Sequence, residues 1–176
     1  MFDAEMVAPC GLDCSLCAQA LKKENPCPGC NGGDEFKPEF CSTRCQIINC
    51  EHLPSLHGDY CDACSQYPCE HLKEREYRYM NQYPLPESPT NNLKMIREKG
   101  MAYFLESQKE KWSCLDCGGI ISVHTGLCSK CHKNYGRKTR ENPAWWLSQH
   151  KPDNALPPFH AYRRNNSLQT LSERTR

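Results

Sequence analysis

The sequence has few of the large apolar residues from which a folded domain normally builds its core. Leu, Ile, Val and Phe together number 27 of the 176 residues, and this share of about 15 % is below the roughly 20 % at which a packed core becomes doubtful. A disordered chain of this composition normally carries a large net charge, whereas the formal net charge here is only +1. We therefore expect a folded protein that does not rely on apolar burial alone.

The chain also lacks the segments that direct proteins to or through a membrane. Its first residues include acidic side chains and no basic stretch followed by an apolar run, so we expect no secretory signal. No segment approaches the roughly 18 consecutive apolar residues of a membrane span. The sequence therefore predicts a cytoplasmic protein without a membrane partner.

Cysteine, by contrast, is abundant, with fifteen residues in the chain. Small folds with weak cores are often held together by disulfides or metals. In a reducing compartment, closely spaced thiols are more often metal ligands than disulfides, and an odd count fits poorly with complete pairing. We expect several bound metal ions, three or four in all, with zinc as the expected metal.

The clearest local pattern is two pairs of cysteines, each pair separated by two residues. The ligands that it predicts for one metal ion are Cys114, Cys117, Cys128 and Cys131. Two such turns can direct four thiolates at one tetrahedral ion, so the pattern is typical of a zinc ribbon. Because four thiolates already complete the site, His124 and His132 are interpreted as surface residues.

The other eleven cysteines lie in the N-terminal part and do not divide evenly into sites of four. The candidate ligands are Cys10, Cys14, Cys17, Cys27, Cys30, Cys41, Cys45, Cys50, Cys61, Cys64 and Cys69. They would complete two four-cysteine sites with three thiols left over, or three sites with a twelfth ligand. His52, His57 and His71 are the candidates for that ligand.

Three alternatives to zinc arise from the same cysteines. Cysteine-only ligation also suits an iron–sulfur cluster in the N-terminal domain. The spacing of Cys10, Cys14 and Cys17 equals that of radical S-adenosylmethionine enzymes, but their barrel needs about 200 residues or more and many strands. Cys128 to His132 matches the c-type haem pattern, which would leave Cys114 and Cys117 without a role.

The predicted fold is small, metal-stabilised and mostly α with short β-hairpins, and it combines a cysteine-knuckle N-terminal domain with a zinc ribbon. Helical stretches are predicted over 16–23 and 41–50 and from Pro68 to Met80, and Gly100 is placed where one helix can end and another begin. The predicted segments are a cysteine-rich metal-binding domain (1–82), a proline-rich linker interpreted as a solvated spacer (83–90), a helical segment (91–111), the ribbon (112–136) and a basic, largely irregular tail (137–176).

Four ordered motifs resemble those of a known family. They are Ala8 to Cys17, the Cys27 to Cys30 knuckle, Cys45 to Cys50, and Cys61 to Cys69. Together they are similar to the prokaryotic cysteine-rich domain of unknown function 3795, here followed by an appended C-terminal zinc ribbon. The resemblance implies metal binding through the cysteines and transfers no catalytic residue.

The function expected from these patterns is a structural-zinc scaffold or interaction module with a protein partner, and the alternative is an iron–sulfur or thiol-based redox protein. A zinc hydrolase has the least support, since no pair of histidines at helical spacing offers an open metal site. Trp145 and Trp146 are interpreted as packing residues or a partner anchor. Basic residues near Tyr135 and Tyr162 indicate nucleic-acid binding more weakly; they are Arg137, Lys138, Arg140, Arg163 and Arg164.

Overall fold

A computed structural model describes residues 2–56 and 60–136 of the chain. Its three α-helices are α1 (Glu70–Asn81), α2 (Pro89–Lys99) and α3 (Met101–Trp112). Five short helical turns come before them, at Ala4–Met6, Cys14–Leu16, Phe40–Arg44, Leu53–Leu56 and Cys61–Ala63. Within the described residues, every helix is too short or too polar to cross a membrane.

The boundaries of α2 follow directly from local sequence chemistry. The hydroxyl oxygen of Ser88 accepts a hydrogen bond from the backbone N–H of Asn91 at 3.1 Å, and Pro89 occupies the first helical turn, where no N–H is needed. Gly100 ends α2 with a φ of +85° and a backbone hydrogen bond to the carbonyl of Ile96. The helix break at Gly100 is thus confirmed.

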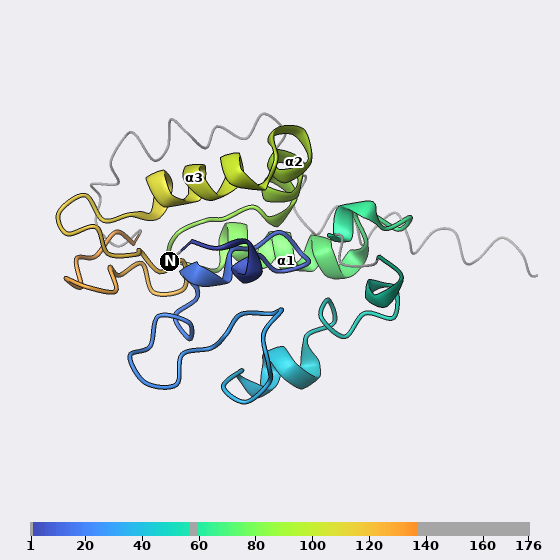
Figure 1. The fold of residues 1–176 in the computed structure, drawn as a ribbon, viewed down its shortest axis with the longest axis horizontal. Coiled ribbons are helices and arrows are strands. Elements are labelled where there is room, and N and C mark those ends of the chain that lie inside the picture. Colours follow the sequence, from blue (N-terminus) through green and yellow to red (C-terminus); the bar gives the residue numbers. More distant parts are fainter. Residues whose placement is uncertain (1, 57–59, 137–176) are drawn as a thin grey trace, which may run out of the picture. The chain divides into compact units, whose positions relative to one another are not determined.

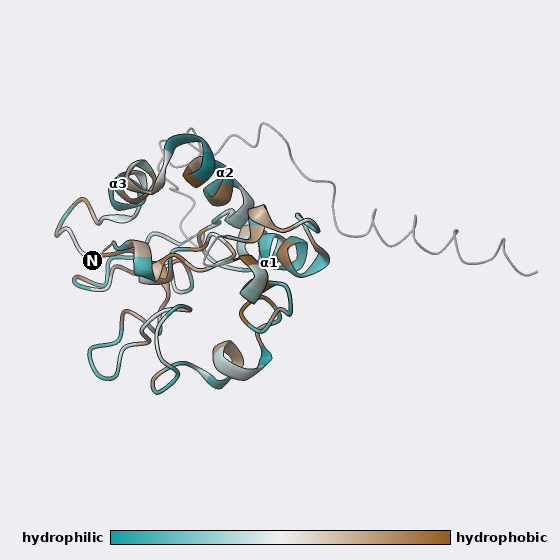
Figure 2. Cartoon of the chain, turned by 45° about the vertical axis from the view of Figure 1, so that its right-hand side comes forward, coloured by the Kyte–Doolittle hydropathy of each residue, from teal (hydrophilic) through white to brown (hydrophobic). Residues whose placement is uncertain are grey.

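The helices pack on one another through apolar stripes rather than through a sheet. α2 contacts both α1 and α3 (Figure 1), and each helix presents hydrophobic and hydrophilic sides (Figure 2). The main core includes Leu16, Leu72, Leu93, Trp112 and Val123, all at most 3 % exposed. Four cysteine side chains are part of the same core, namely Cys10, Cys45, Cys114 and Cys128.

The expected β-hairpins are not formed in the described part of the chain, where the structure has isolated β-bridges and no strand. The bridges pair Val7 with Asp13, Ser113 with Ile120, Ile121 with Cys128, and Leu127 with Asn134. The turns around the cysteines redirect the backbone after a few residues, so no pairing extends beyond one bridge.

Two of the three predicted N-terminal helical stretches are also wrong. The segment 16–23 forms turns after the Cys14–Leu16 turn, and 41–50 contains only the single wide turn Phe40–Arg44 followed by further turns. The backbone of Cys17 and of Cys45 is extended, with ψ of 132° and 109°, which stops a helix at each position. The third stretch is confirmed as α1.

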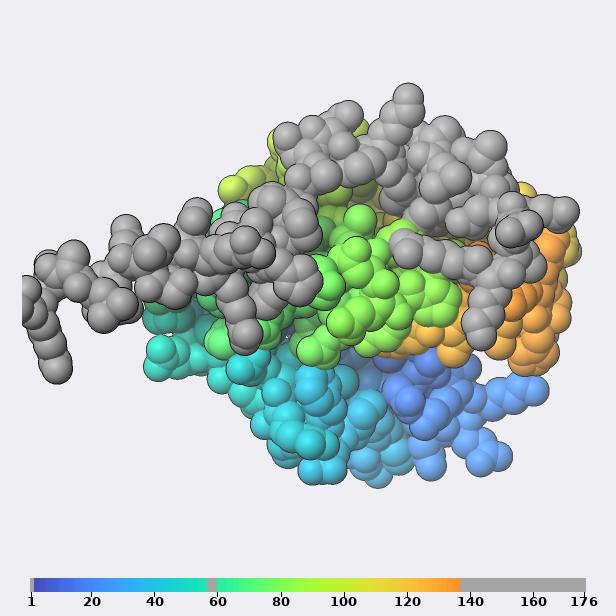
Figure 3. Space-filling view, turned by 180° about the vertical axis from the view of Figure 1, so that it is seen from behind, coloured from blue at the N-terminus to red at the C-terminus, as the bar shows by residue number. Residues whose placement is uncertain are grey.

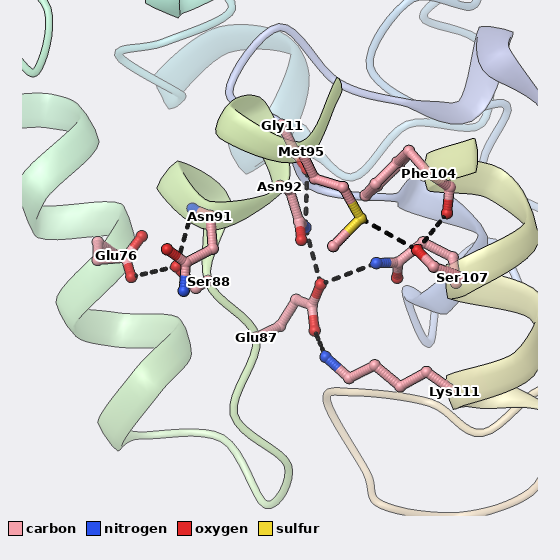
Figure 4. A network of polar contacts seen from close by, with 11 residues as sticks. Gly11, Glu76, Glu87, Ser88, Asn91, Asn92, Met95, Phe104, Ser107 and Lys111 are labelled. Atoms are coloured by element: carbon pink, nitrogen blue, oxygen red, sulfur yellow. Dashed lines mark hydrogen bonds and ion pairs between the residues drawn. The ribbon is translucent and has the colours of Figure 1, made fainter. Parts of the chain in front are cut away.

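The segment 83–90 is not the solvated spacer that its prolines suggest. Leu85 is 3 % exposed and Glu87 is 1 % exposed. The Glu87 carboxylate forms an ion pair with Lys111 and accepts hydrogen bonds from the amides of Asn92 (2.7 Å) and Gln108 (3.4 Å), as Figure 4 shows. The buried carboxylate of Glu87 therefore links this segment to both α2 and α3.

The same network reaches the first cysteine loop. The side-chain amide of Asn92 also donates to the carbonyl oxygen of Gly11 at 2.9 Å. Gly11 has a φ of +86°, and a Cβ there would lie 2.6 Å from both the Pro89 carbonyl oxygen and Cγ of Leu93. Only glycine fits this approach, so the loop beside Cys10 lies directly on the start of α2.

Candidate metal centres

The four ribbon cysteines form a compact group. Their Sγ atoms all lie within 4.8 Å of one another, with 3.6 Å between Cys114 and Cys131 and 3.5 Å between Cys117 and Cys128. Four thiolates bound tetrahedrally at about 2.3 Å from one ion would lie about 3.8 Å apart, whereas a disulfide joins its sulfurs at about 2.0 Å. The arrangement fits a shared metal ion and could hold one.

The two turns of this group share one backbone geometry. The residue after each second cysteine has a positive φ, +68° at Gly118 and +60° at His132. Its N–H donates to the carbonyl of the first cysteine of the pair, Cys114 (2.8 Å) and Cys128 (3.0 Å) respectively. His132 thus occupies a turn position, and its exposed side chain agrees with the expectation of a surface residue.

A glycine and a tyrosine complete the surroundings of the sulfurs. A Cβ at Gly119 would lie 2.7 Å from the Cys128 Sγ, so the backbone of Gly119 passes too close to this sulfur for a larger residue. The hydroxyl of Tyr135 lies 3.1 Å from the Cys114 Sγ, and this hydrogen bond lowers the pKa of Cys114 to about 6. A thiol that is ionised near neutral pH is ready to bind a metal.

His124 was expected at the surface, and the structure corrects this interpretation. Its Nδ1 accepts a hydrogen bond from the Ala18 N–H (3.4 Å), and its Nε2 lies 2.9 Å from the Tyr79 hydroxyl. Burial lowers the pKa of His124 to about 4, so the ring is neutral at pH 7. The ring joins the ribbon segment (112–136) to the N-terminal turns and to α1, and it lies outside the group of four thiols.

The first N-terminal cluster contains five cysteines from three loops. They are Cys14, Cys17, Cys27, Cys30 and Cys41. The Sγ atoms of Cys14 and Cys30 lie 3.6 Å apart. Burial, and then the nearby cysteine side chains Cys30, Cys17 and Cys27, raise the pKa of Cys41 to about 11. Mutual electrostatic effects of this kind indicate that these loops bring their thiols near one another.

A second group of thiols lines a cavity of about 580 Å³ beside the start of α1. Its cysteines are Cys45, Cys50, Cys61, Cys64 and Cys69. Burial raises the pKa of Cys61 to about 12, with further contributions from the neighbouring cysteine side chains Cys10, Cys69, Cys50 and Cys64. All fifteen cysteines lie in the described residues, and all have free thiols.

Two of the candidate histidines also line this cavity, and the third lies outside the described residues. His52 has its Nε2 2.9 Å from Nε2 of Gln66, and His71 is exposed. His57 belongs to the segment 57–59, which the structure does not describe. Among the described residues, the ribbon thiols alone bring three or more candidate ligand atoms within 4.8 Å of one another.

Several cysteines of the N-terminal part lie near an arginine that the sequence did not single out. The guanidinium of Arg75 in α1 donates to the Cys45 Sγ at 3.1 Å. Burial raises the pKa of the neighbouring Cys10 to about 12, although the positive charge of Arg75 opposes this shift. No spacing rule pairs an arginine with a cysteine thirty residues earlier, so the sequence held no signal for this contact.

Several residues with predicted roles lie outside the described part of the chain. They are the two tryptophans Trp145 and Trp146 and the basic residues of the tail, Arg137, Lys138, Arg140, Arg163 and Arg164. Tyr135 is described, and it contacts a ribbon sulfur.

Comparison with known proteins identifies the N-terminal part. None of the curated proteins and none of the solved structures matches the chain. Residues 6–74, which span all eleven N-terminal cysteines, match the model of the family described as Protein of unknown function (DUF3795). The resemblance inferred from the four cysteine motifs is thereby confirmed for residues 6–74.

Proposed function

We propose that this protein is a zinc-stabilised scaffold that presents a rigid surface to a protein partner in the cytoplasm. The observation that supports this most directly is the ribbon group, whose four Sγ atoms lie within 4.8 Å of one another. Zinc is the ion that most commonly takes four thiolates in a tetrahedron, and such a closed site leaves no position for a reacting water. The role of this site is therefore structural rather than catalytic.

The weak apolar core explains why metal would be needed. Cys114 and Cys128 are part of the main core, at 2 % and 0 % exposed. Without a metal, thiolates at these positions would repel one another in a buried site, whereas one divalent ion would offset part of their charge. Metal binding and folding of the ribbon segment are then one event.

The ribbon segment also carries a side chain suited to contact another protein. Leu115 lies between the first two ribbon cysteines and is 80 % exposed, more than any other large hydrophobic residue of the described chain. The adjacent turn is held by the hydrogen bond from the Gly118 N–H to the Cys114 carbonyl. A fixed turn with an apolar tip can contact the surface of a partner protein.

A second candidate function is a thiol-based or iron–sulfur redox protein. The observation that favours it is the number of N-terminal thiols outside the compact ribbon group, including the Cys14 and Cys30 pair at 3.6 Å. Cysteine-only ligation is as suitable for iron–sulfur clusters as for zinc. Such a centre would lie in the domain of residues 6–74.

Elemental analysis of the full chain, purified without oxygen or chelator, tests both candidates. The scaffold proposal expects zinc in whole-number amounts per chain, a colourless protein and unfolding on chelation. Iron with acid-labile sulfide and absorption near 400 nm would support the redox candidate for the N-terminal domain. A chain that folds equally well without any metal would contradict the scaffold proposal and an iron–sulfur centre, and it would leave thiol-based redox chemistry as the remaining candidate.

A further inference from the structure

The cavity beside α1 has the chemistry of a second metal centre. It measures about 580 Å³, and five cysteines from three parts of the chain line it. We propose that Cys50, Cys61, Cys64 and Cys69 ligate a thiophilic metal centre in this cavity, separate from the ribbon. This inference deepens the proposed function, because it rests on the cysteines of this chain serving as metal ligands.

The loop Cys61–Cys64 is a single tight turn with a cysteine at each end. The N–H of Cys64 donates to the carbonyl of Cys61 at 3.1 Å, and the backbone of Cys64 then becomes extended with a ψ of 138°. A spacing of two residues lets both sulfurs of such a turn reach one metal. Cys50 and Cys69, from the segments on either side, provide two further thiols around the same cavity.

An ion pair from α2 holds this loop in place. Arg97 donates from Nε to the carboxylate of Asp62 at 2.7 Å and from Nη2 to the Asp62 carbonyl at 2.6 Å. Asp62 directly follows Cys61, so Arg97 holds the turn through both the side chain and the main-chain carbonyl of Asp62. Metal sites depend on such contacts because they orient the ligands before the ion binds.

The N-terminus of α1 favours a negatively charged centre beside Cys69. Four thiolates and one divalent ion carry a charge of about −2. Cys69 is the N-cap of α1, a helix of 12 residues, and makes no side-chain capping hydrogen bond. The positive end of the helix dipole would therefore face a metal-bound Cys69 sulfur. Arg44 also lines the cavity, as do the carboxylates of Glu51 and Glu70.

The fifth cysteine of the cavity differs from the other four. The Cys45 Sγ accepts a hydrogen bond from the Arg75 guanidinium at 3.1 Å. This sulfur therefore already has a hydrogen-bond partner within the protein, and we assign it no metal bond. The remaining four thiols are the number that a closed zinc site or a four-iron cluster requires.

Zinc and an iron–sulfur cluster would use the same four thiolates, and metal analysis distinguishes them. The four ribbon sulfurs lie within 4.8 Å of one another, whereas among the described residues no three sulfurs of the cavity cysteines do. A single zinc ion would draw the sulfurs to about 3.8 Å from one another, whereas a cluster would occupy more of the cavity and hold them farther apart.

The test is native mass spectrometry, with iron and sulfide analysis, of the full chain purified without oxygen. Three variants are compared with the wild type: Cys64→Ser, in the proposed centre; Cys45→Ser, a control that lines the same cavity; and Cys131→Ser, in the ribbon. Cys64→His is added because it keeps a metal-binding side chain if the serine variant does not fold. Circular dichroism reports the folding of each variant.

The proposal expects Cys64→Ser to lose one metal centre while the ribbon metal stays, and Cys64→His and Cys45→Ser to keep both. Loss of zinc alone identifies a zinc site, and loss of iron with sulfide identifies a cluster. The proposal is overturned if Cys64→Ser keeps the metal content of the wild type or if Cys45→Ser loses the same centre as Cys64→Ser. Loss of metal from Cys131→Ser tests the ribbon separately, so failure of one assignment is not mistaken for failure of the other.

Discussion

The hydroxyl of Tyr79 lies 2.9 Å from Nε2 of His124, and this contact joins α1 to the ribbon segment. The same ring accepts the Ala18 N–H and lies with its centroid 4.5 Å from that of Tyr83. A nearby backbone bond from the Val123 N–H to the Leu16 carbonyl (3.1 Å) adds to this junction, and Figure 3 shows the early residues (blue) against the ribbon segment (orange). The cysteine-rich domain and the ribbon segment therefore share one packed interface.

The His124 junction predicts acid-sensitive stability. The folded protein holds the pKa of His124 near 4, below its ordinary value of 6.5, because burial disfavours the charged ring. The unfolded chain therefore binds a proton more readily between pH 6.5 and 4. The stability that depends on a neutral His124 is complete above pH 6.5 and declines as the pH falls towards 4.

Urea unfolding near pH 7 and near pH 5 checks this prediction. Between these pH values the wild type should lose about 2 kcal/mol more free energy of unfolding than His124→Gln. Protonation of the thiols affects both proteins, so the comparison isolates the histidine. Equal losses in the two proteins would show that His124 does not couple folding to pH.

Loss of one ribbon thiol should unfold the ribbon segment. Cys128 is fully buried in the four-thiol group, and a structural zinc ion contributes on the order of 10 kcal/mol to the folding of small zinc-finger peptides. In Cys128→Ser we expect loss of the ribbon metal and loss of amide protection over 112–136 in hydrogen-exchange mass spectrometry. The matched control is Ser129→Ala, one residue further along the same turn, which should keep both.

A methyl group at Gly119 should disturb the same site without removing a ligand. It would lie 2.7 Å from both the Cys128 Sγ and Cβ of Lys130. We expect Gly119→Ala to lower the free energy of unfolding by about 1–3 kcal/mol and to speed metal release to a chelator. Gly33→Ala is the control, since a Cβ there meets no atom within 4 Å; a Gly119→Ala protein as stable as this control would contradict the geometry.

The buried ion pair of Glu87 and Lys111 should matter more than an ordinary surface pair. Their side chains are 1 % and 13 % exposed, and removing one member of a buried pair typically costs about 3–5 kcal/mol. Glu87→Gln should therefore lower the thermal melting temperature markedly, because it leaves the Lys111 charge without compensation.

A double variant separates this loss of charge compensation from a general loss of packing. Combining Glu87→Gln with Lys111→Met removes both charges, so it should recover a substantial part of the stability lost in Glu87→Gln. The surface pair of Lys109 and Glu106, with side chains 62 % and 74 % exposed, provides a control; Glu106→Gln should change stability by less than about 1 kcal/mol. If the stability losses of Glu87→Gln and Lys111→Met simply add up in the double variant, the two side chains are not energetically coupled.

Several features could be predicted because they depend on a few neighbouring residues. A spacing of two residues between cysteines produces a turn whichever fold surrounds it, so the ribbon thiols could be grouped from sequence. Gly100 interrupts the helical pattern in the same local way, and the four motifs of residues 6–74 were sufficient to suggest the family.

Other features depend on contacts between residues far apart in the chain, and these were missed or misjudged. A helical stretch was predicted over 16–23, but the extended backbone of Cys17 leads into turns instead. Glu87 stood in a proline-rich stretch that resembled a spacer, while its partners Asn92, Gln108 and Lys111 come from α2 and α3. The contact between Arg75 and Cys45 likewise joins two segments that no sequence pattern connects.

The sequence alone determined that this chain would rely on thiol groups, since its apolar residues are too few for an ordinary core and ten of its fifteen cysteines form five pairs with two residues between the partners. The tertiary structure decided which thiols meet, because that depends on how the loops pack against α1 and α2. It placed four thiols within one ion's reach in the ribbon segment, five around a cavity, and one of those five against an arginine. Spacing along a chain sets only local turns, whereas distances between distant cysteines are set by packing.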